Sequence, residues 1–301
     1  MELGMIGLGR MGSNMAQRLL RGGHRLVVYD PVPQAVQSVV KHGASGAKSI
    51  SDLVAKLSPP RIVWLMVPSG EATESTINSL ASELSQSDIV IDGGNSYYKD
   101  SIRRAAFLSQ RGLIFLDIGT SGGVWGLEEG YCLMVGGDAR AFKIIEPIIQ
   151  TLSPSPDKGY GYVGPSGAGH YVKMVHNGIE YGLMQAYAEG FELLQAKKQF
   201  NLNLLNIAEI WRYGSVVRSW LLDLTTRALE EDPKLASIDA YVEDTGEGRW
   251  AVEESIELSI PVPVITESLQ ARFRSRQDRP FGARLLAALR QQFGGHAVRK
   301  A

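Results

Sequence analysis

The sequence has few of the features that mark secreted or membrane proteins. Cys132 is the only cysteine among the 301 residues, so no disulfide can form within the chain, and a lone thiol suits a reducing compartment. No apolar run approaches the roughly 20 residues that span a bilayer. The first residues, MELGMIGLGRMG, lack the basic and the long apolar segments of a signal peptide. We therefore expect a cytoplasmic protein with no membrane partner.

Excess charge and metal-ligand patterns are also missing. The net charge is −1, with 31 basic and 32 acidic residues, and this balance argues against a nucleic-acid partner. No His, Cys and Asp residues cluster at metal-ligand spacing. The acidic pairs Glu128-Glu129 and Glu253-Glu254 fit a loop turn and a solvated helix face, so we expect no metal. The hydrophobic content of 44% allows an ordinary globular chain of two domains.

Short apolar runs alternate with amphipathic stretches in the first half of the chain. The runs are bounded by Gly, Pro, Ser or Asp and suit buried strands of a parallel sheet. They cover residues 3–8, 26–29, 62–67, 89–91 and 113–118, and further strand-like runs follow at residues 132–135 and 160–163. Helical patterns lie between them, for example at residues 11–21, 71–84 and 139–152. This alternation predicts an α/β fold with a Rossmann-like doubly wound sheet.

The pattern changes after Gly164-Pro165-Ser166-Gly167. From residue 168 to about 198 the chain has no proline and is apolar at helical spacing, and the remainder shows few strand signals. We expect a dinucleotide-binding Rossmann-like domain over residues 1–165. An all-helical substrate and oligomerisation domain, opened by one long helix, would follow over residues 166–301.

The first predicted strand ends in a nucleotide-binding fingerprint. Gly7-Leu8-Gly9-Arg10-Met11-Gly12 fits G-x-G-x-x-G between a strand and a helix, where glycines permit a tight turn and close approach of a pyrophosphate. Such a turn can be purely structural, and Asp30 can be a solvated turn residue beside Pro31. Together, however, the turn and an acid about twenty residues later predict a dinucleotide site, with Asp30 on the adenosine ribose. A carboxylate there would repel the 2′-phosphate of NADP, so we expect NAD.

A polar stripe follows on the long predicted helix. Lys173, His176, Asn177 and Glu180 are spaced i, i+3, i+4 and i+7, and Tyr181 lies one turn beyond Asn177. The stripe can be a solvent-facing side, but Gly178 costs about 1 kcal/mol of helix propensity and makes sense where something packs closely. A lysine near a nicotinamide can act as general base, and a nearby glutamate can donate a proton.

Several motifs along nearly the whole chain resemble the β-hydroxyacid dehydrogenase superfamily, and within it the 6-phosphogluconate dehydrogenases. Lys173 and Asn177 by themselves would fit any member of the wider superfamily. The more specific segments are Ile91-Asp92-Gly93-Gly94-Asn95-Ser96, Ser121-Gly122-Gly123, Glu128-Glu129-Gly130, His176-Asn177-Gly178-Ile179-Glu180-Tyr181, Gly248-Arg249-Trp250, Val262-Pro263-Val264, Ala271-Arg272 and Phe293-Gly294-Gly295-His296.

The resemblance implies oxidative decarboxylation of 6-phosphogluconate to ribulose 5-phosphate and CO₂ with reduction of NAD. Lys173 would take the proton from the C3 hydroxyl of the substrate. After CO₂ is lost, Glu180 would protonate C1 of the enediol intermediate. The sugar-acid end would be held by Asn95, Ser121, Gly122, Gly123, His176 and Asn177. The phosphate would be held by Tyr181 and Arg272. Val67, Pro68, Ser69 and Asn95 would line the cofactor.

Two further expectations follow from the resemblance. Arg290 and His296 look like tail residues that complete a neighbouring subunit's site, which implies a homodimer or homotetramer. The common long form has a larger helical domain, so this chain would be a short form. Thr245 stands where the family commonly has a phosphate-binding Lys, and Arg249 would have to compensate or the phosphate would be held by fewer cations.

Two alternatives stay open. Another β-hydroxyacid dehydrogenase, acting on a small unphosphorylated acid such as 3-hydroxyisobutyrate, would share Lys173, Asn177 and Ser121-Gly122-Gly123. It would give no reason for Tyr181, Arg272, Arg290 and His296 to occur together. A non-catalytic nucleotide-sensing protein is the second alternative, since Rossmann folds host such functions; the intact Lys173 and Glu180 pair argues against it.

Overall fold

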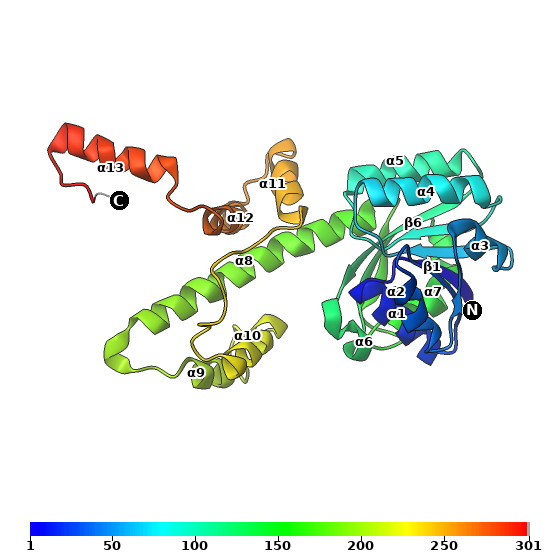
Figure 1. Cartoon of the computed structure of the whole chain (residues 1–301), viewed down its shortest axis with the longest axis horizontal. Coiled ribbons are helices and arrows are strands. Elements are labelled where there is room, and N and C mark those ends of the chain that lie inside the picture. Colours follow the sequence, from blue (N-terminus) through cyan, green and yellow to red (C-terminus); the bar gives the residue numbers. More distant parts are fainter. Residues whose placement is uncertain (300–301) are drawn as a thin grey trace. The chain divides into compact units, whose positions relative to one another are not determined.

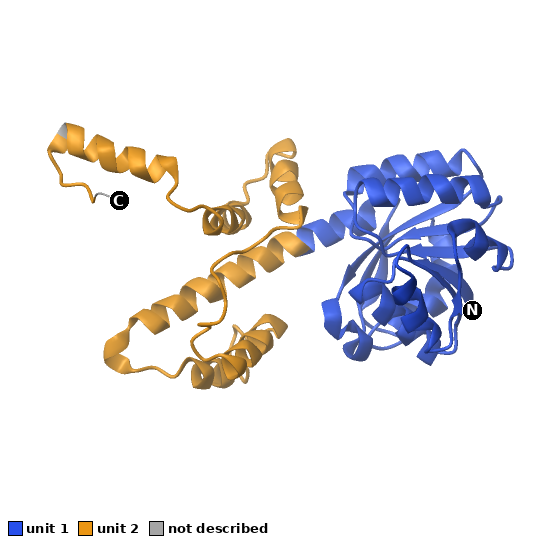
Figure 2. Cartoon of the chain, in the orientation of Figure 1, with its two compact units in different colours: residues 1–176 blue, residues 177–301 orange. Residues whose placement is uncertain are grey.

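The computed structural model describes residues 1–299, and these form two compact units (Figures 1 and 2). The first unit is Met1–His176, and the second begins at Asn177. The sequence places the boundary at residue 165, before the long helix. The units instead divide inside that helix, because its first turns pack on the sheet of the first unit: a Cβ at Gly169 would lie 2.2 Å from the Asp117 carbonyl oxygen.

One eight-stranded sheet forms the centre of the first unit, in the order β3-β2-β1-β4-β5-β6-β7-β8. The strands are β1 Glu2–Ile6, β2 Arg25–Tyr29, β3 Ser45–Gly46, β4 Ile62–Leu65, β5 Ile89–Asp92, β6 Ile114–Ser121, β7 Cys132–Gly137 and β8 Tyr160–Gly164. The chain first moves outward from β1 through β2 to β3 and then returns to the other side of β1 at β4. This reversal creates a switch point between β1 and β4, the usual place for a ligand in such sheets.

Strand β7 breaks the parallel pairing of its neighbours, since it pairs antiparallel with β6. Only residues 122–131 join the two strands, and they hold the short helices η1 (Gly123–Trp125) and α6 (Gly126–Glu129). A parallel neighbour needs a crossover of a dozen or more residues, so this connection is too short for one. Strand β8 is again parallel to β7 after the helix α7.

Helices cover both faces of the sheet and make a three-layer unit. On one face pack α1 (Arg10–Arg21), α2 (Pro33–Val40) and α7 (Ala139–Leu152); on the other pack α3 (Ile50–Ala55), α4 (Glu71–Glu83) and α5 (Tyr98–Ser109). Neighbouring strand residues serve opposite faces: Met5 belongs to the first core cluster and Ile6 to the second. The central strands β1, β4 and β5 are largely apolar because both of their faces are buried.

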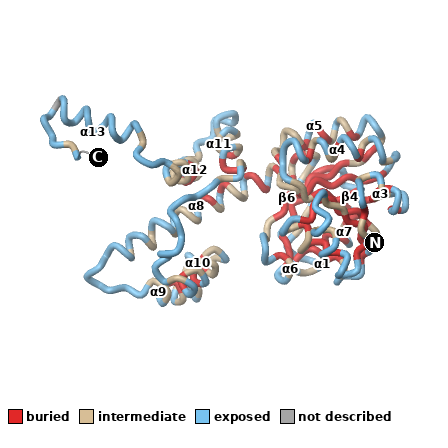
Figure 3. Tube along the Cα trace, viewed as in Figure 1, coloured by how far each residue is buried: buried red, intermediate tan, exposed pale blue. Residues whose placement is uncertain are grey.

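Helices are the only regular secondary structure in the described residues of the second unit. Helix α8 (Ala168–Ala196) runs into it from the first unit and matches the predicted long helix closely. The others are η2 (Lys198–Phe200), α9 (Leu204–Trp211), α10 (Trp220–Glu231), α11 (Glu247–Glu257), α12 (Pro263–Ser275) and α13 (Phe281–Gly294). A small core of Ala208, Leu222 and Leu229 lies between α9 and α10 (Figure 3).

Within residues 1–299, no helix is both long enough and apolar enough to cross a bilayer.

Candidate active site

A cavity of about 680 Å³ opens at the switch point of the sheet in the first unit. The turns after β1, β4 and β5 and the start of α4 form its walls. The lining residues are Ile6, Gly7, Gly9, Arg10, Met11, Gly12, Tyr29, Asp30, Pro31, Ile50, Met66, Val67, Pro68, Ala72, Ser75, Thr76, Gly93, Gly94 and Asn95. Most of the predicted cofactor residues therefore gather in one cavity.

The fingerprint glycines differ in what a side chain at each position would contact. Gly7 has φ +90°, and a Cβ on it would lie 2.5 Å from the Met66 carbonyl oxygen; a Cβ on Gly12 would lie 2.0 Å from the Gly7 carbonyl oxygen. These two positions allow the strand, turn and helix to pack closely. A Cβ on Gly9 would meet nothing within 4 Å, so this position leaves space for a ligand.

The start of helix α1 suits an anion. Its N-cap residue, Gly9, offers no side chain, and no acidic residue lies in the first turn. The first N–H groups of a helix have no partner within the helix, and the helix dipole favours negative charge there. A pyrophosphate therefore fits this end of the cavity.

Asp30 is fixed at the wall of the same cavity. Its Oδ2 accepts a hydrogen bond from the Leu8 backbone N–H at 2.7 Å, and its Oδ1 accepts one from the Val32 N–H at 2.8 Å. The carboxylate therefore ties the end of β2 to the fingerprint turn. Leu8 is buried beneath the turn, and neither Leu8 nor Ser69 is among the residues that line the cavity.

One part of the cavity wall was not predicted from the sequence. Ala72, Ser75 and Thr76 line the cavity from the first turns of α4. Their spacing of i, i+3 and i+4 puts small side chains on one face of a predicted helix that directly follows Val67-Pro68-Ser69. That spacing was the available signal.

The carboxyl ends of β5 and β6 are joined through Asn95. Its Nδ2 donates to the Thr120 carbonyl oxygen at 3.0 Å, and its Oδ1 accepts from the Thr120 N–H at 2.8 Å. Asn95 also has a left-handed backbone conformation, with φ +52°. Because Thr120 precedes Ser121, this pair of hydrogen bonds holds Asn95 beside the Ser121-Gly122-Gly123 turn.

Lys173 packs directly against a glycine of β6. Its side chain is buried, at 5% exposed, and a Cβ on Gly119 would be 2.4 Å from the Lys173 Cβ. Lys173 Nζ and His176 Nδ1 are 3.4 Å apart. The structure thus brings Lys173 and His176 together in the first unit, as the stripe predicts.

The first turn of α8 is anchored by a buried carboxylate. Asp117 Oδ1 accepts from the Gly167 N–H at 2.7 Å and Asp117 Oδ2 from the His170 N–H at 2.9 Å. A negative charge at a helix N-terminus is stabilising. Asp117 on β6 therefore fixes the helix segment that carries Lys173.

In the second unit, Tyr181 and Arg272 come together. The Arg272 guanidinium lies 3.5 Å from the centre of the Tyr181 ring, and its Nη1 donates to the Glu243 carbonyl oxygen at 2.8 Å. The Thr245 N–H approaches the Tyr181 hydroxyl at 3.4 Å. The two predicted phosphate ligands are therefore neighbours, and the position where the family commonly has Lys lies beside them.

Arg249 is engaged elsewhere. Its Nε and Nη2 donate to the two carboxylate oxygens of Asp244 at 2.7 and 3.1 Å, and Arg276 adds a third bond at 2.9 Å. The hydrogen bond from Arg249, followed by that from Arg276, holds the pKa of Asp244 below its usual range. Arg249 therefore serves Asp244 and is poorly placed to compensate for Thr245.

The remaining predicted residues lie in the second unit. Asn177 and Glu180 follow on α8 at the expected spacing. Arg290 lies on α13 and His296 follows the end of that helix, and both are exposed. Within the described residues, no group of three or more His, Cys, Asp or Glu side chains could hold a metal ion.

Comparisons with known families agree with this geometry. A profile of the NAD binding domain of 6-phosphogluconate dehydrogenase matches residues 2–164, and a profile of the 6-phosphogluconate dehydrogenase C-terminal domain matches residues 169–281. The NAD(+)-dependent, decarboxylating 6-phosphogluconate dehydrogenase of Haloferax volcanii is 46% identical over 99% of this chain and 98% of its own length. The NADP(+)-dependent, decarboxylating enzyme of Bacillus subtilis is 38% identical over 91% of this chain, but only 61% of that relative is covered.

Solved structures place the fold in the same group. The Plasmodium falciparum 6-phosphogluconate dehydrogenase superposes with a TM-score of 0.84 at 28% identity, over 100% of this chain and 66% of that one. A Mycobacterium tuberculosis 3-hydroxyisobutyrate dehydrogenase gives 0.74 at 21% identity, over 96% of this chain and 99% of that one, which shows the shared fold alone. The predicted resemblance is confirmed, including the short form. Since both family domains match in order and a relative of similar length is 46% identical, the chain belongs to the 6-phosphogluconate dehydrogenase family.

Proposed function

We propose that the chain catalyses the oxidative decarboxylation of 6-phosphogluconate to ribulose 5-phosphate and CO₂, with NAD as the oxidant. The observation that carries this proposal is that Lys173, buried beside β6, belongs to the same unit as a dinucleotide cavity with a fixed Asp30. The name of the Haloferax volcanii relative states the same activity and cofactor.

The cavity fits NAD in three respects. Gly9 leaves open space, the uncapped start of α1 would receive the pyrophosphate, and the Asp30 carboxylate would accept hydrogen bonds from the adenosine ribose. When bound, NAD supplies the hydride acceptor for C3 of the substrate. The same carboxylate would repel a 2′-phosphate, and Pro31-Val32-Pro33 offer no arginine to neutralise it, so NAD is preferred over NADP.

Lys173 is assigned the role of general base. It takes the proton from the C3 hydroxyl as the hydride leaves, and the resulting 3-keto acid then loses CO₂. The protonated Lys173 donates a hydrogen bond to the carbonyl oxygen and stabilises the developing enolate. His176, whose Nδ1 lies 3.4 Å from Nζ, keeps the amine in place. Glu180 then protonates C1 of the enediol.

Substrate binding is assigned to two groups of residues. The sugar-acid end is held by Asn95, Ser121, Gly122, Gly123, His176 and Asn177. Tyr181 and Arg272 hold the phosphate, for which a guanidinium is the strongest donor. The stacked arrangement of these two side chains favours a phosphorylated substrate over a small unphosphorylated acid. With Thr245 in place of Lys, the phosphate is held by fewer cations.

We further propose that the chain works as a homodimer or homotetramer. Every residue in 281–292 is exposed, including Phe281, Leu285, Leu286 and Leu289 of helix α13. A single exposed helix of 14 residues is marginal in water, so a second copy of the chain is the proposed cover. Arg290 and His296 on this segment would then complete the neighbour's substrate site.

Initial rates test the proposal directly. The purified protein is assayed with 6-phosphogluconate and either NAD or NADP, while released CO₂ is trapped. Turnover with CO₂ release and a higher kcat/KM for NAD is the expected result. Activity on 3-hydroxyisobutyrate without turnover of 6-phosphogluconate would refute the substrate and favour the small-acid alternative. A monodisperse monomer with full activity would refute the shared-site roles of Arg290 and His296.

A further inference from the structure

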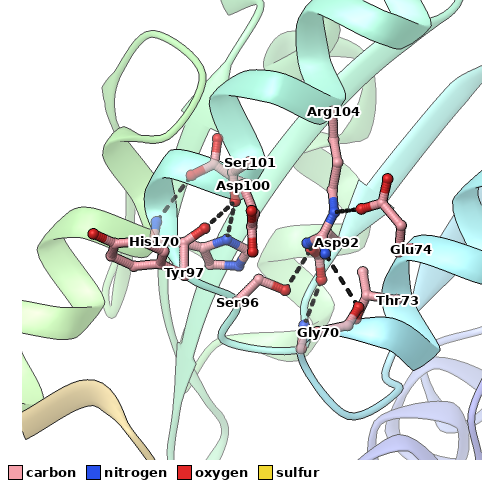
Figure 4. A network of polar contacts seen from close by, with 12 residues as sticks. Gly70, Thr73, Glu74, Asp92, Ser96, Tyr97, Asp100, Ser101, Arg104 and His170 are labelled. Atoms are coloured by element: carbon pink, nitrogen blue, oxygen red, sulfur yellow. Dashed lines mark hydrogen bonds and ion pairs between the residues drawn. The ribbon is translucent and has the colours of Figure 1, made fainter. Parts of the chain in front are cut away.

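Arg104 is a charged side chain in the interior of the first unit that the proposed chemistry does not use. It lies on α5, and only 1% of it is exposed. Its guanidinium donates to three acceptors: Nε to Glu74 Oε2 at 3.0 Å, Nη1 to Asp92 Oδ2 at 3.3 Å and Nη2 to the Gly70 carbonyl oxygen at 3.3 Å (Figure 4). Gly70 and Glu74 belong to the start of α4 and Asp92 to the end of β5; none of them lines the cavity itself, but each lies next to residues that do.

Two of these acceptors lie at the ends of turns that border the cavity: Gly70 closes the turn after β4, and Asp92 begins the turn after β5. Gly70 is the N-cap residue of α4, and the first turns of α4 line the cavity. Asp92 ends β5, and its carboxylate also accepts from the Gly94 N–H at 3.0 Å and the Ser96 hydroxyl at 2.7 Å. Arg104 therefore connects the turn after β4 with the turn after β5.

The two turns touch each other with no spare room. A Cβ on Gly94 would lie 2.5 Å from the Val67 carbonyl oxygen. Val67 and Gly94 both line the cavity, so any change in the spacing of the turns changes the wall that faces the ligand. Asn95, directly after Gly94, would move with it and lose its alignment with Thr120.

Stability alone gives a weak reason for such a buried ion pair. Well-packed apolar residues in place of a buried ion pair are often neutral or stabilising, because the charges lose their hydration. What a guanidinium adds is geometry, since its planar fork of donors reaches several acceptors in fixed directions, whereas a lysine ammonium is a compact point charge. Arg104 thus supplies a fixed spacing that packing would define less sharply.

We propose that Arg104 is a positioning residue for the dinucleotide: it sets the spacing of the turns after β4 and β5 that form one wall of the NAD site. The proposal rests on the proposed function of the cavity. It does not depend on which hydroxy acid is the substrate, because its effect is on the cofactor.

The neighbouring arginine provides a matched control. Arg103 is on the same helix and also binds Glu74, at 2.7 and 2.8 Å, but its side chain is 55% exposed. Its other hydrogen bond goes to Asp100 on its own helix rather than to either turn. Arg103→Met therefore removes a guanidinium and two hydrogen bonds to Glu74 without removing any bond to the two turns.

The experiment measures the Kd of NAD by calorimetry for the wild type, Arg104→Lys, Arg104→Met and Arg103→Met. Steady-state kinetics then give KM for NAD, KM for the sugar acid and kcat. We expect Arg104→Lys to raise both the Kd and the KM for NAD by roughly tenfold, and Arg104→Met to raise them by more. The loss of one hydrogen bond to a charged group changes a binding constant by about this factor. Arg103→Met should change both by less than about twofold, as surface ion pairs usually do. The constant for the sugar acid should change far less than that for NAD.

Ser96→Ala covers the case in which an Arg104 variant does not fold. It removes only the hydroxyl bond to Asp92 and should raise the Kd of NAD by a few fold, in the range of one hydrogen bond. Folded Arg104 and Ser96 variants that bind NAD like the wild type would overturn the proposal, as would an equal loss in Arg103→Met. Wild-type protein that binds no NAD would instead refute the cofactor assignment, and the proposal with it. Binding of NAD without turnover of 6-phosphogluconate would refute only the substrate.

Discussion

The two units differ in how completely they bury their apolar side chains. In the first, two core clusters cover both faces of the sheet, and residues such as Trp64 and Ile145 are fully buried. In the second, one small cluster stands beside many exposed apolar residues, among them Leu193 at 74% and Ile256 at 74% (Figure 3). Large exposed apolar patches often mark interaction sites. The first unit buries most of its apolar side chains within one chain, whereas those of the second would be covered in the oligomer that we propose.

This difference matches the division of labour in the proposed function. The cofactor cavity and Lys173 lie in the unit with the complete core, where fixed side chains can hold reacting atoms precisely. Tyr181 and Arg272, the proposed phosphate ligands, lie in the second unit, whose exposed apolar residues the proposed oligomer would cover. Chemistry and substrate affinity should therefore respond differently to substitutions in the two units.

The largest expected effect contrasts Lys173→Met with Arg272→Met. Loss of the general base should lower kcat by roughly 10²- to 10⁴-fold, with NAD affinity unchanged. Loss of the phosphate ligand should mainly weaken apparent substrate affinity, so that KM for the phosphorylated sugar acid rises by roughly ten- to a hundredfold. Steady-state kinetics and NAD titration of both variants measure this. An Arg272→Met enzyme with normal substrate affinity and greatly reduced kcat would contradict the division.

The next contrast concerns stability. Ile145→Ala, in the first unit, should lower the free energy of unfolding by about 2–5 kcal/mol, because it leaves a cavity in a dense core. Leu286→Ala, at a position 65% exposed on α13, should change intrachain stability by less than about 0.5 kcal/mol. Urea unfolding at fixed protein concentration gives both values.

Self-association should show the opposite order. If a second copy covers α13, Leu286→Ala should raise the dissociation constant of the oligomer, while Ile145→Ala should leave it unchanged in the folded fraction. Sedimentation velocity over a range of concentrations measures this. Identical association of the wild type and Leu286→Ala would remove α13 from the interface.

A smaller effect should appear at low pH in both units. Arg103, followed by Arg104, lowers the pKa of Glu74 to about 2, and Arg249 with Arg276 lowers that of Asp244. A depressed pKa in the folded state gives stability above the unfolded value of 4.5 for Glu74, and this is lost as the pH falls toward 2.

The variants Glu74→Gln and Asp244→Asn should therefore weaken the pH dependence. Between pH 5 and pH 3, urea unfolding of the wild type should lose about 1–2 kcal/mol more than Glu74→Gln, a figure reduced for solvent screening. Asp244→Asn should act in the same direction. An unchanged slope in either variant would show that the corresponding arginines do not stabilise the ionised acid.

A small effect is also expected for Gly178→Ala. A Cβ there would lie 3.1 Å from Ile265 Cδ1, the end of a flexible side chain, so Ala should be accommodated with a net change below about 1 kcal/mol after the gain in helix propensity. Gly119→Ala in the first unit meets the Lys173 Cβ and the Gly169 carbonyl oxygen instead, and should be clearly destabilising. The melting temperatures of both variants test whether the second unit accommodates an added methyl group that the first unit does not.

Periodicity was sufficient to predict most of the sheet and the long helix, since buried strands and a proline-free helix leave local patterns. It could not predict the antiparallel β7, because direction depends on the length of the connection at 122–131. The short strand β3 at Ser45–Gly46 carries no apolar run to detect.

The site was predictable where one motif holds its residues and less so where tertiary contacts do. Gly9 belongs to the fingerprint, Asp30 follows it at the expected spacing of about twenty residues, and Lys173 belongs to the stripe on α8, so the sequence alone shows these patterns. The network of Arg104, Asp92 and Glu74 joins three elements, and a sequence gives no sign that an arginine on an amphipathic helix points inward. The engagement of Arg249 by Asp244 is likewise a tertiary fact.

The approach of Gly119 to Lys173 affects how mutational data on this protein should be interpreted. A saturation screen scored by turnover would find position 119 about as intolerant as position 173, although glycine has no reactive group. If residues were ranked only by how few substitutions they tolerate, Gly119 would be grouped with the proposed catalytic residues. Its actual role is to leave space for the Lys173 side chain. Libraries intended to change the substrate range should accordingly keep Gly119 constant and begin their variation at Ser121, two residues further along the same strand.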